Sequence, residues 1–190
     1  MLPIQMVDLQ SQYRQLKKEL DARVIGCIES GAFIQGPEVK SFEADLGKYL
    51  DDAHVIACAN GTDALQIALM ALELDPGDEV IVPSFTFVAS VEVIALLGLK
   101  PIVVDVDPRS FLLKIEDIEA SLSPRTKAII PVHLFGQCVN MKALMAIAKN
   151  RDLFVIEDNA QSIGARCIAT GDAKEMSGTI GHIGCTSFYP

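Results

Sequence analysis

The spacing of apolar residues changes near residue 54 of this chain. Before that point apolar residues recur every three or four positions, which is typical of amphipathic helices. We predict a first helix over residues 8–30, ended by Gly31, and a second helix that begins at Pro37 and continues to Leu50. The amino-terminal part is therefore expected to be a helical arm.

From residue 54 onward, short apolar runs alternate with helical stretches. We predict strands at residues 54–59, 79–82, 102–106, 128–132, 153–156 and 183–188. We predict helices at residues 63–74, 84–97, 116–122 and 141–149. This alternation is typical of βαβ units and a mainly parallel sheet. The sequence therefore predicts an α/β fold with a helical arm over residues 1–52 and a doubly wound domain over residues 53–190.

One apolar run leads directly into two carboxylates. Leu153–Ile156 is followed by Glu157 and Asp158, and an unbroken run of this kind indicates a strand buried on both faces. Asp158 then lies at the carboxyl end of that strand, where open α/β sheets bind their ligands. A partly buried carboxylate needs a partner such as a metal, a base or a cationic ring nitrogen, and Gln161 can add a neutral donor. The alternative is a plain strand-end acid or a helix N-cap.

A second candidate site is the turn that contains Gly61, Thr62 and Asp63. A strand, a glycine turn and the start of an apolar helix together present free N–H groups and the positive end of the helix dipole, which suits a phosphate. The alternative is an ordinary turn with Thr62 or Asp63 as the N-cap, and that alternative is favoured when the turn is considered alone.

Two further segments carry weaker signals. Phe85 and Phe87 alternate after a predicted strand, so one of them can face the sheet edge and stack on a planar ring, or both can lie in the core. Ser187 follows the last predicted strand and either reaches a phosphate or is a plain strand-end serine. We interpret His133 as structural, and no spacing supports a catalytic triad.

Composition narrows the possible partners. The chain has 190 residues, half of them hydrophobic, and a net charge of −9, which argues against nucleic acid as a partner but allows a small anionic ligand. Five scattered cysteines form no metal-ligand pattern, so we expect reduced thiols in the cytoplasm and no metal site. No apolar run approaches a membrane span, and the start does not resemble a signal peptide.

The order of the motifs is more specific than any one of them. The motifs are Gly-Pro-Glu-Val at residue 36, Asn-Gly-Thr-Asp-Ala-Leu at 60, Pro-Ser-Phe-Thr-Phe-Val-Ala-Ser at 83, Pro-Val-His-Leu-Phe-Gly-Gln at 131, Glu-Asp-Asn-Ala-Gln-Ser-Ile-Gly-Ala at 157 and Thr-Ser-Phe-Tyr-Pro at 186. Together they resemble the DegT/DnrJ/EryC1/StrS family of sugar aminotransferases over essentially the whole chain. The resemblance implies a type I aminotransferase fold, pyridoxal 5′-phosphate (PLP) or its amino form pyridoxamine 5′-phosphate (PMP) as cofactor, and a homodimer.

The resemblance also implies roles for individual residues. At the cofactor it places Asp158 on the pyridine nitrogen, Gln161 near the phenolic oxygen, Phe87 on the ring face, and Gly61, Thr62, Asp63 and Ser187 at the phosphate. It places Gly31 and Phe33, less specifically, in the loop that helps to form the sugar-nucleotide site. A carboxylate at the ring nitrogen keeps that nitrogen protonated, so the ring can take up electron density from a carbanion.

The family's Schiff-base lysine is expected two residues beyond Pro190, where the sequence ends. We therefore expect this sequence to be the amino-terminal part of a longer protein. The small domain would then also lie beyond it.

The resemblance implies transfer of an amino group, usually from glutamate, to a keto group of a nucleotide-linked sugar. Our best substrate hypothesis is UDP-2-acetamido-2-deoxy-3-oxo-glucuronate, for synthesis of bacterial surface polysaccharide such as lipopolysaccharide, with dTDP-linked 3- or 4-keto sugars as the near alternative. Relatives with histidine in place of the lysine act as sugar 3-dehydratases, so residue 192 would discriminate. An alternative of another class is a non-enzymatic module that binds a phosphorylated ligand or a partner protein. The charge argues against a DNA-binding regulator.

Overall fold

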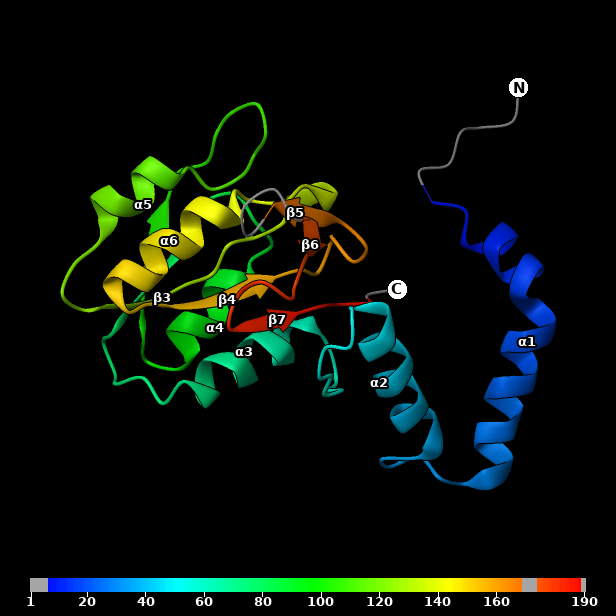
Figure 1. Cartoon of the computed structure of the whole chain (residues 1–190). Coiled ribbons are helices and arrows are strands. Elements are labelled where there is room, and N and C mark those ends of the chain that lie inside the picture. The colour runs from blue at the N-terminus through cyan, green and yellow to red at the C-terminus, as the bar shows by residue number, and fades with distance from the viewer. Residues whose placement is uncertain (1–6, 169–173, 189–190) are drawn as a thin grey trace. The chain divides into compact units, whose positions relative to one another are not determined.

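The computed structural model describes residues 7–168 and 174–188 (Figure 1). These residues form two compact units. The first contains the residues up to Tyr49 together with His54–Ala57, and the second contains Leu50–Ala53 and the residues from Cys58 onward. The predicted division into residues 1–52 and 53–190 stays a prediction, and each unit is described by itself.

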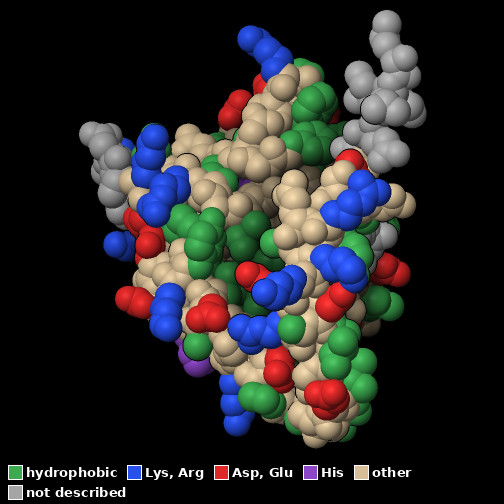
Figure 2. All heavy atoms as spheres, turned by 90° about the vertical axis from the view of Figure 1, so that its right-hand side faces the viewer, with side chains coloured by type: hydrophobic (Ala, Val, Ile, Leu, Met, Phe, Trp, Pro, Cys, Tyr) green, Lys and Arg blue, Asp and Glu red, His purple; other side chains and the backbone are tan. Residues whose placement is uncertain are grey.

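The first unit consists of helices α1 (Leu9–Ser30) and α2 (Pro37–Tyr49). The Asp8 carboxylate caps α1 by accepting a hydrogen bond from the Ser11 N–H at 2.9 Å. Gly31 ends α1 in the left-handed conformation (φ 65°), which glycine adopts without a steric penalty. Both predicted helices are confirmed, but no residue of α1 is buried. Figure 2 shows apolar side chains at the surface between basic and acidic ones.

The second unit contains a sheet of five parallel strands, as the sequence predicts. Its strands are β1 (Glu79–Pro83), β2 (Lys100–Val104), β3 (Thr126–Ile129), β4 (Phe154–Asp158) and β7 (Ile183–Cys185). They lie in the order β2-β1-β3-β4-β7, so the chain starts in the middle of the sheet and adds strands on both sides. The α/β fold class is confirmed.

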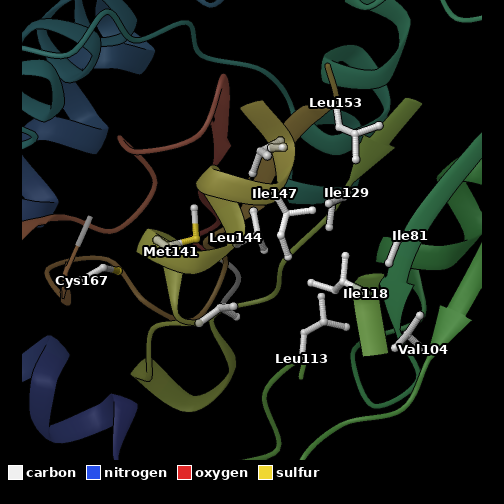
Figure 3. Packing of buried hydrophobic residues seen from close by; sticks show 13 residues of the cluster. Ile81, Val104, Leu113, Ile118, Ile129, Met141, Leu144, Ile147, Leu153 and Cys167 are labelled. Atoms are coloured by element: carbon white, nitrogen blue, oxygen red, sulfur yellow. The ribbon is translucent and has the colours of Figure 1, made fainter. Parts of the chain in front are cut away.

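Helices cover both faces of this sheet (Figure 1). One face carries α3 (Gly61–Ala71) and α4 (Ala89–Leu96), and the other carries α5 (Ile115–Ser121) and α6 (Met141–Arg151). Within β1 the side chains alternate between these faces. Ile81 packs in the cluster of α5 and α6 (Figure 3), and Val80 and Val82 pack with α3 and α4. None of these three side chains is exposed, which explains the continuous apolar run in the sequence.

The helix predicted from residue 84 begins only at Ala89, and the strand predicted at residues 183–188 ends at Cys185. Two further features of the backbone differ more strongly from the prediction. Residues 54–59 pair with no strand that the structure describes, so the strand predicted there is wrong; the Ala57 N–H donates instead to the Glu43 carboxylate at 2.8 Å. An antiparallel hairpin of β5 (Arg166–Ile168) and β6 (Lys174–Met176) was not predicted. Its strands have three residues each, too few to give an alternating signal.

The expectation of five reduced thiols is wrong for two of them. Cys138 and Cys167 form a disulfide, with 5.5 Å between their Cα atoms, and Cys27, Cys58 and Cys185 are free. Hairpin strand β5 brings Cys167 to the loop that precedes α6, a contact between residues 29 apart that the spacing could not reveal. Among the described residues, no cluster of three or more His, Cys, Asp or Glu side chains is arranged to hold a metal ion. No helix in residues 7–168 and 174–188 is long and apolar enough to cross a membrane.

The disulfide predicts a specific labelling pattern. In denaturant without reductant, an alkylating reagent should modify Cys27, Cys58 and Cys185, and peptide mapping should find Cys138 and Cys167 in one cross-linked peptide. Replacing Cys138 with serine should lower the free energy of unfolding by about 2–4 kcal/mol, whereas Cys58→Ser should change it little. Alkylation of all five cysteines before reduction would contradict the pairing.

Candidate active site

The carboxyl ends of β4 and β7 form the edge that carries the candidate site. In the register of these strands, Asp158 lies opposite Cys185, and Thr186 and Ser187 follow immediately. Backbone hydrogen bonds hold Asp158 on its other side, because its N–H donates to the Pro131 carbonyl (2.9 Å) and its carbonyl accepts from the His133 N–H (3.0 Å). The position of Asp158 at the end of an interior strand agrees with the prediction.

The Asp158 carboxylate is almost fully buried, with 5% of the residue exposed. The Ser90 hydroxyl donates to its Oδ2 at 2.7 Å, and the Ala160 N–H donates to Oδ1 at 3.2 Å. Burial raises the pKa of Asp158, and the hydrogen bonds from Ser90 and Ala160 offset only part of that effect. None of the ion pairs among the described residues includes Asp158. In the part of the chain that the structure describes, this acid therefore has no positive partner of the kind that a buried carboxylate needs.

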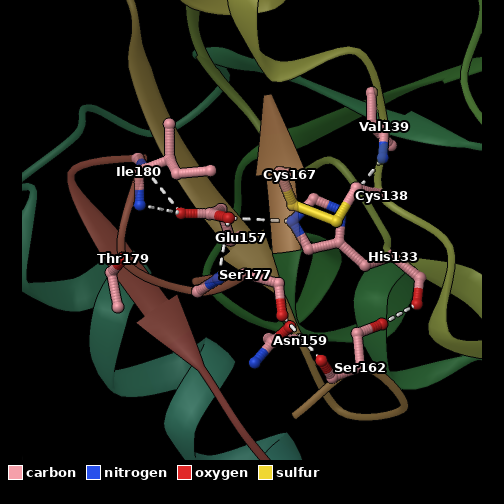
Figure 4. Close-up of polar contacts among 12 residues, drawn as sticks. His133, Cys138, Val139, Glu157, Asn159, Ser162, Cys167, Ser177, Thr179 and Ile180 are labelled. Atoms are coloured by element: carbon pink, nitrogen blue, oxygen red, sulfur yellow. Dashed lines mark hydrogen bonds and ion pairs between the residues drawn. A yellow bond between two sulfur atoms is a disulfide. The ribbon is translucent and has the colours of Figure 1, made fainter. Parts of the chain in front are cut away.

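The neighbouring Glu157 has the opposite environment. Its carboxylate is completely buried and accepts hydrogen bonds from the backbone N–H groups of Gly178 (2.9 Å), Ile180 (2.7 Å) and Gly181 (2.6 Å) (Figure 4). Burial by itself raises the pKa of Glu157, but hydrogen bonds from His133 and these amides outweigh it, so the pKa lies below its ordinary value. Glu157 is a saturated structural anion that holds the turn after β6.

His133 completes that arrangement. The Val139 N–H donates to His133 Nδ1 at 3.2 Å, so the ring proton of the neutral imidazole lies on Nε2. Nε2 is 2.8 Å from Glu157 Oε2 and donates to it. The ring is fully buried, which agrees with the interpretation of His133 as structural.

The predicted phosphate turn begins helix α3. Its N-cap is Asn60, whose side-chain oxygen accepts from the Asp63 N–H at 2.9 Å, so the alternative with Thr62 or Asp63 as the cap is wrong. A Cβ atom at Gly61 would lie 2.8 Å from the Ser187 Cβ, closer than such atoms approach. Only glycine lets the start of α3 meet Ser187, and the Gly61 and Thr62 N–H groups are the first-turn donors left for a ligand.

Strand geometry relates the acid to this phosphate cradle, which we define as Gly61, Thr62 and Ser187. Ser187 lies two residues beyond Cys185, the partner of Asp158. With a strand spacing of about 4.8 Å and a rise of about 3.3 Å per residue, the Cα atoms of Asp158 and Ser187 are separated by roughly 8 Å. A small phosphorylated ring can span that length. The structure thus brings together segments far apart in the sequence.

Two other predicted residues are Gln161, which follows β4, and Phe87, which precedes α4. The Gln161 side-chain oxygen accepts from the Phe135 N–H at 3.1 Å, which leaves the amide NH₂ of this exposed residue available to a ligand. Phe87 is 69% exposed, and its carbonyl accepts from the Ser90 N–H, so it belongs to the turn that enters α4. Phe85 is 49% exposed, and the alternative that both rings lie in the core is therefore wrong.

The structure does not test the roles predicted for the remaining residues. Gly31 and Phe33 belong to the first unit, and their role stays a prediction. Tyr189 and Pro190 of the last motif lie outside the described residues. A hollow of about 430 Å³ lies where β3 and β4 begin and is lined in part by Thr126 and Leu153. Asp158 lies at the other end of β4.

Sequence reasoning missed Ser90 and Thr86. Ser90 is fully buried, donates to Asp158 and lies 3.0 Å from the Thr86 hydroxyl. The available signal was the spacing of two hydroxyls four residues apart in an otherwise apolar helix start. That signal did not identify Asp158, which is 68 residues away.

Comparison with known proteins places this chain among sugar aminotransferases of one family. The family model described as the DegT/DnrJ/EryC1/StrS aminotransferase family matches residues 14–190. Two curated relatives are each 46% identical over 98% of this chain. One is the UDP-2-acetamido-2-deoxy-3-oxo-D-glucuronate aminotransferase of Pseudomonas aeruginosa, of which 51% is covered. The other is the UDP-N-acetyl-3-dehydro-alpha-D-glucosamine 3-aminotransferase of Acidithiobacillus ferrooxidans, of which 49% is covered.

Solved structures give the same result. A DegT DnrJ EryC1 StrS aminotransferase from Brucella abortus superimposes with a TM-score of 0.90 at 45% identity, over 99% of this chain and 51% of that one. NtdA from Bacillus subtilis, with bound cofactor PMP, gives a TM-score of 0.76 at 39% identity, over 79% of this chain and 34% of that one. The chain spans about half the length of the curated relatives above.

We expect neutral substitutions of the adjacent acids Asp158 and Glu157 to have opposite effects on the free energy of unfolding. Because burial raises the pKa of Asp158, its ionised form is disfavoured by folding, and this cost is present at neutral pH and disappears at pH values below the ordinary range of the acid. Asp158→Asn should therefore raise the free energy of unfolding at pH 7 in denaturant titrations. The difference from the wild type should vanish in acid.

Glu157→Gln provides the contrasting variant on the same strand. The lowered pKa of Glu157 means that its contribution is present at neutral pH and lost on acidification. Its replacement should cost about 3 kcal/mol at pH 7, because three buried amides lose a charged acceptor. Destabilisation by Asp158→Asn of the same size as by Glu157→Gln would contradict the distinction.

Proposed function

Because the chain belongs to the DegT/DnrJ/EryC1/StrS aminotransferase family, we propose that the protein is a PLP-dependent sugar aminotransferase. It moves an amino group from an amino acid, most simply glutamate, to the keto group of a nucleotide-linked sugar. The observation that carries this proposal is a buried acid, Asp158, that has no cationic partner among the described residues and lies beside the phosphate cradle at one edge of a parallel sheet.

The residues at this edge fit the cofactor in charge and in shape. Asp158 pairs with the protonated ring nitrogen, which supplies the positive charge that its buried carboxylate requires. The Gly61 and Thr62 amides, the Thr62 hydroxyl and the Ser187 hydroxyl hold the phosphate at the start of α3. Asp63 stabilises the turn, because its N–H donates to the Asn60 side-chain oxygen and its carboxylate accepts from the Asn60 amide NH₂.

Two more residues orient the ring. Phe87 stacks on its face from the exposed turn before α4, and the Gln161 amide NH₂ donates to the phenolic oxygen. When bound, PLP supplies an electron sink for the carbanion that forms at the substrate carbon. The protein's part is to keep the ring nitrogen protonated through Asp158 and to hold the ring fixed between phosphate and acid.

The substrate is proposed from the relatives. UDP-2-acetamido-2-deoxy-3-oxo-glucuronate is favoured because it is named for the Pseudomonas aeruginosa relative, and the Acidithiobacillus ferrooxidans relative is named for another UDP-linked 3-keto N-acetyl sugar. The pathway would be surface polysaccharide synthesis. We propose that Gly31 and Phe33 contact the sugar nucleotide, and that the protein is a homodimer in the cytoplasm.

The visible spectrum of the whole protein tests this function. With PLP bound, addition of glutamate should change the spectrum of the wild type. Asp158→Ala should keep the fold, by circular dichroism, and lose at least about 100-fold in the rate of that change, because the ring nitrogen loses its counterion. The matched control is Asp105→Ala, which removes the exposed acid at the end of β2.

The products separate the alternatives. An aminosugar supports the aminotransferase, whereas a dehydrated sugar would show the dehydratase reaction. Full turnover by Asp158→Ala would contradict the role of this acid. Absence of any PLP spectrum in the wild type would contradict the function itself.

A further inference from the structure

We propose that the Thr86 and Ser90 hydroxyls form a relay that holds Asp158, and that Ser90 is a positioning residue for the acid that faces the cofactor. This inference rests on the function proposed above for its link to the cofactor, but the relay itself is a property of the described residues.

The contacts define the direction of the relay. Ser90 Oγ lies 2.7 Å from Asp158 Oδ2, and the ionised carboxylate can only accept, so the single hydroxyl proton of Ser90 is used there. The Thr86 and Ser90 hydroxyl oxygens are 3.0 Å apart. With the Ser90 proton committed, Thr86 is the donor in that contact. Donation therefore runs from Thr86 to Ser90 to Asp158.

The segment that enters α4 brings the Ser90 hydroxyl to the acid and the Thr86 hydroxyl to Ser90. Thr86 lies in the bend before α4, and Ser90 lies in the first turn of the helix, which begins at Ala89. The Ser90 N–H donates to the Phe87 carbonyl at 3.2 Å, which fixes the turn between them. Phe87, the proposed stacking residue, lies inside this turn. One short segment thus positions both the aromatic ring and the donor to Asp158.

Burial makes this contact consequential. Ser90 is fully buried and Asp158 is 5% exposed, so water does not readily replace a lost hydroxyl. Ser90 is the only side chain among the described residues with a hydrogen bond to the Asp158 carboxylate. The hydrogen bond that Ser90 accepts from Thr86 polarises the Ser90 hydroxyl and so strengthens the bond from Ser90 to Asp158. Without Ser90, the Ala160 N–H would be the one group of the described residues left to donate a hydrogen bond to the ionised acid.

Other titratable groups around Asp158 are already committed. Glu157, next on β4, is saturated by His133 and three amides, and His133 is held by Val139. Cys185 lies opposite on β7, and burial followed by the nearby Asp158 charge raises the pKa of its thiol to about 12, so it stays neutral. Replacing Ser90 or Thr86 therefore changes the hydrogen bonds to Asp158 without changing the charge of any side chain.

The experiment compares four variants of the whole protein. Ser90→Ala removes the donor, Ser90→Thr keeps a hydroxyl, and Thr86→Val removes the outer hydroxyl while preserving shape. Ser84→Ala is the matched control, since the Ser84 hydroxyl belongs to the same segment but donates to Asp105 at 3.1 Å.

The first measurement needs no cofactor. Carbon-13 NMR of the Asp158 carboxyl should show its titration midpoint shifted upward in Ser90→Ala, shifted upward less in Thr86→Val, and unchanged in Ser84→Ala. Ser90→Thr should restore the wild-type midpoint. A folded Ser90→Ala protein with the wild-type midpoint would overturn the proposal. If Ser90→Ala does not fold, an unchanged midpoint in Thr86→Val overturns it.

The second measurement connects the relay to function. Ser90→Ala should bind PLP about tenfold more weakly and lower kcat about tenfold with little change in KM, because the ring nitrogen is less fully protonated. If the titration midpoints of the variants shift as expected but the wild-type protein binds no PLP, the proposed function is overturned and the relay stands. Unchanged PLP binding and kcat together with shifted midpoints would overturn the link between the two.

Discussion

The removal of Asp158 from water is the constraint on which the site depends. A carboxylate at the end of an interior strand loses hydration, and two hydrogen bonds replace only part of it. Glu157, one residue earlier on the same strand, shows that this fold can saturate a buried acid completely. Under the proposed function, this contrast explains why Asp158 keeps a charge with which a positive group of the ligand can pair.

The parallel sheet converts that local property into a binding site. Pairing of β4 with β7 fixes Ser187 just beyond Asp158, and the glycine at position 61 lets the start of α3 approach Ser187. An acid, a hydroxyl and a helix start then share one edge, as expected for ligand binding in open α/β sheets. The family assignment is the reason for proposing PLP as the ligand, and the groups gathered at this edge are the physical reason for proposing that it binds there.

Much of this arrangement could be predicted from patterns that are local in the sequence. The apolar runs of β1 and β4 and the carboxylate at the end of β4 indicated the sheet and its edge. The features that were missed depend on contacts between distant residues. The Ser90–Asp158 hydrogen bond joins positions 68 apart, and the Cys138–Cys167 disulfide joins positions 29 apart. The prediction of a strand at residues 54–59 was wrong because a short apolar run alone does not supply a pairing partner.

The central claim is that Asp158 keeps the pyridine nitrogen of the cofactor protonated. Nitrogen-15 NMR of ring-labelled PLP bound to the whole protein measures that proton directly. The account predicts a protonated ring nitrogen in the wild type at neutral pH and an unprotonated one in Asp158→Asn. An identical nitrogen shift in both proteins would contradict it.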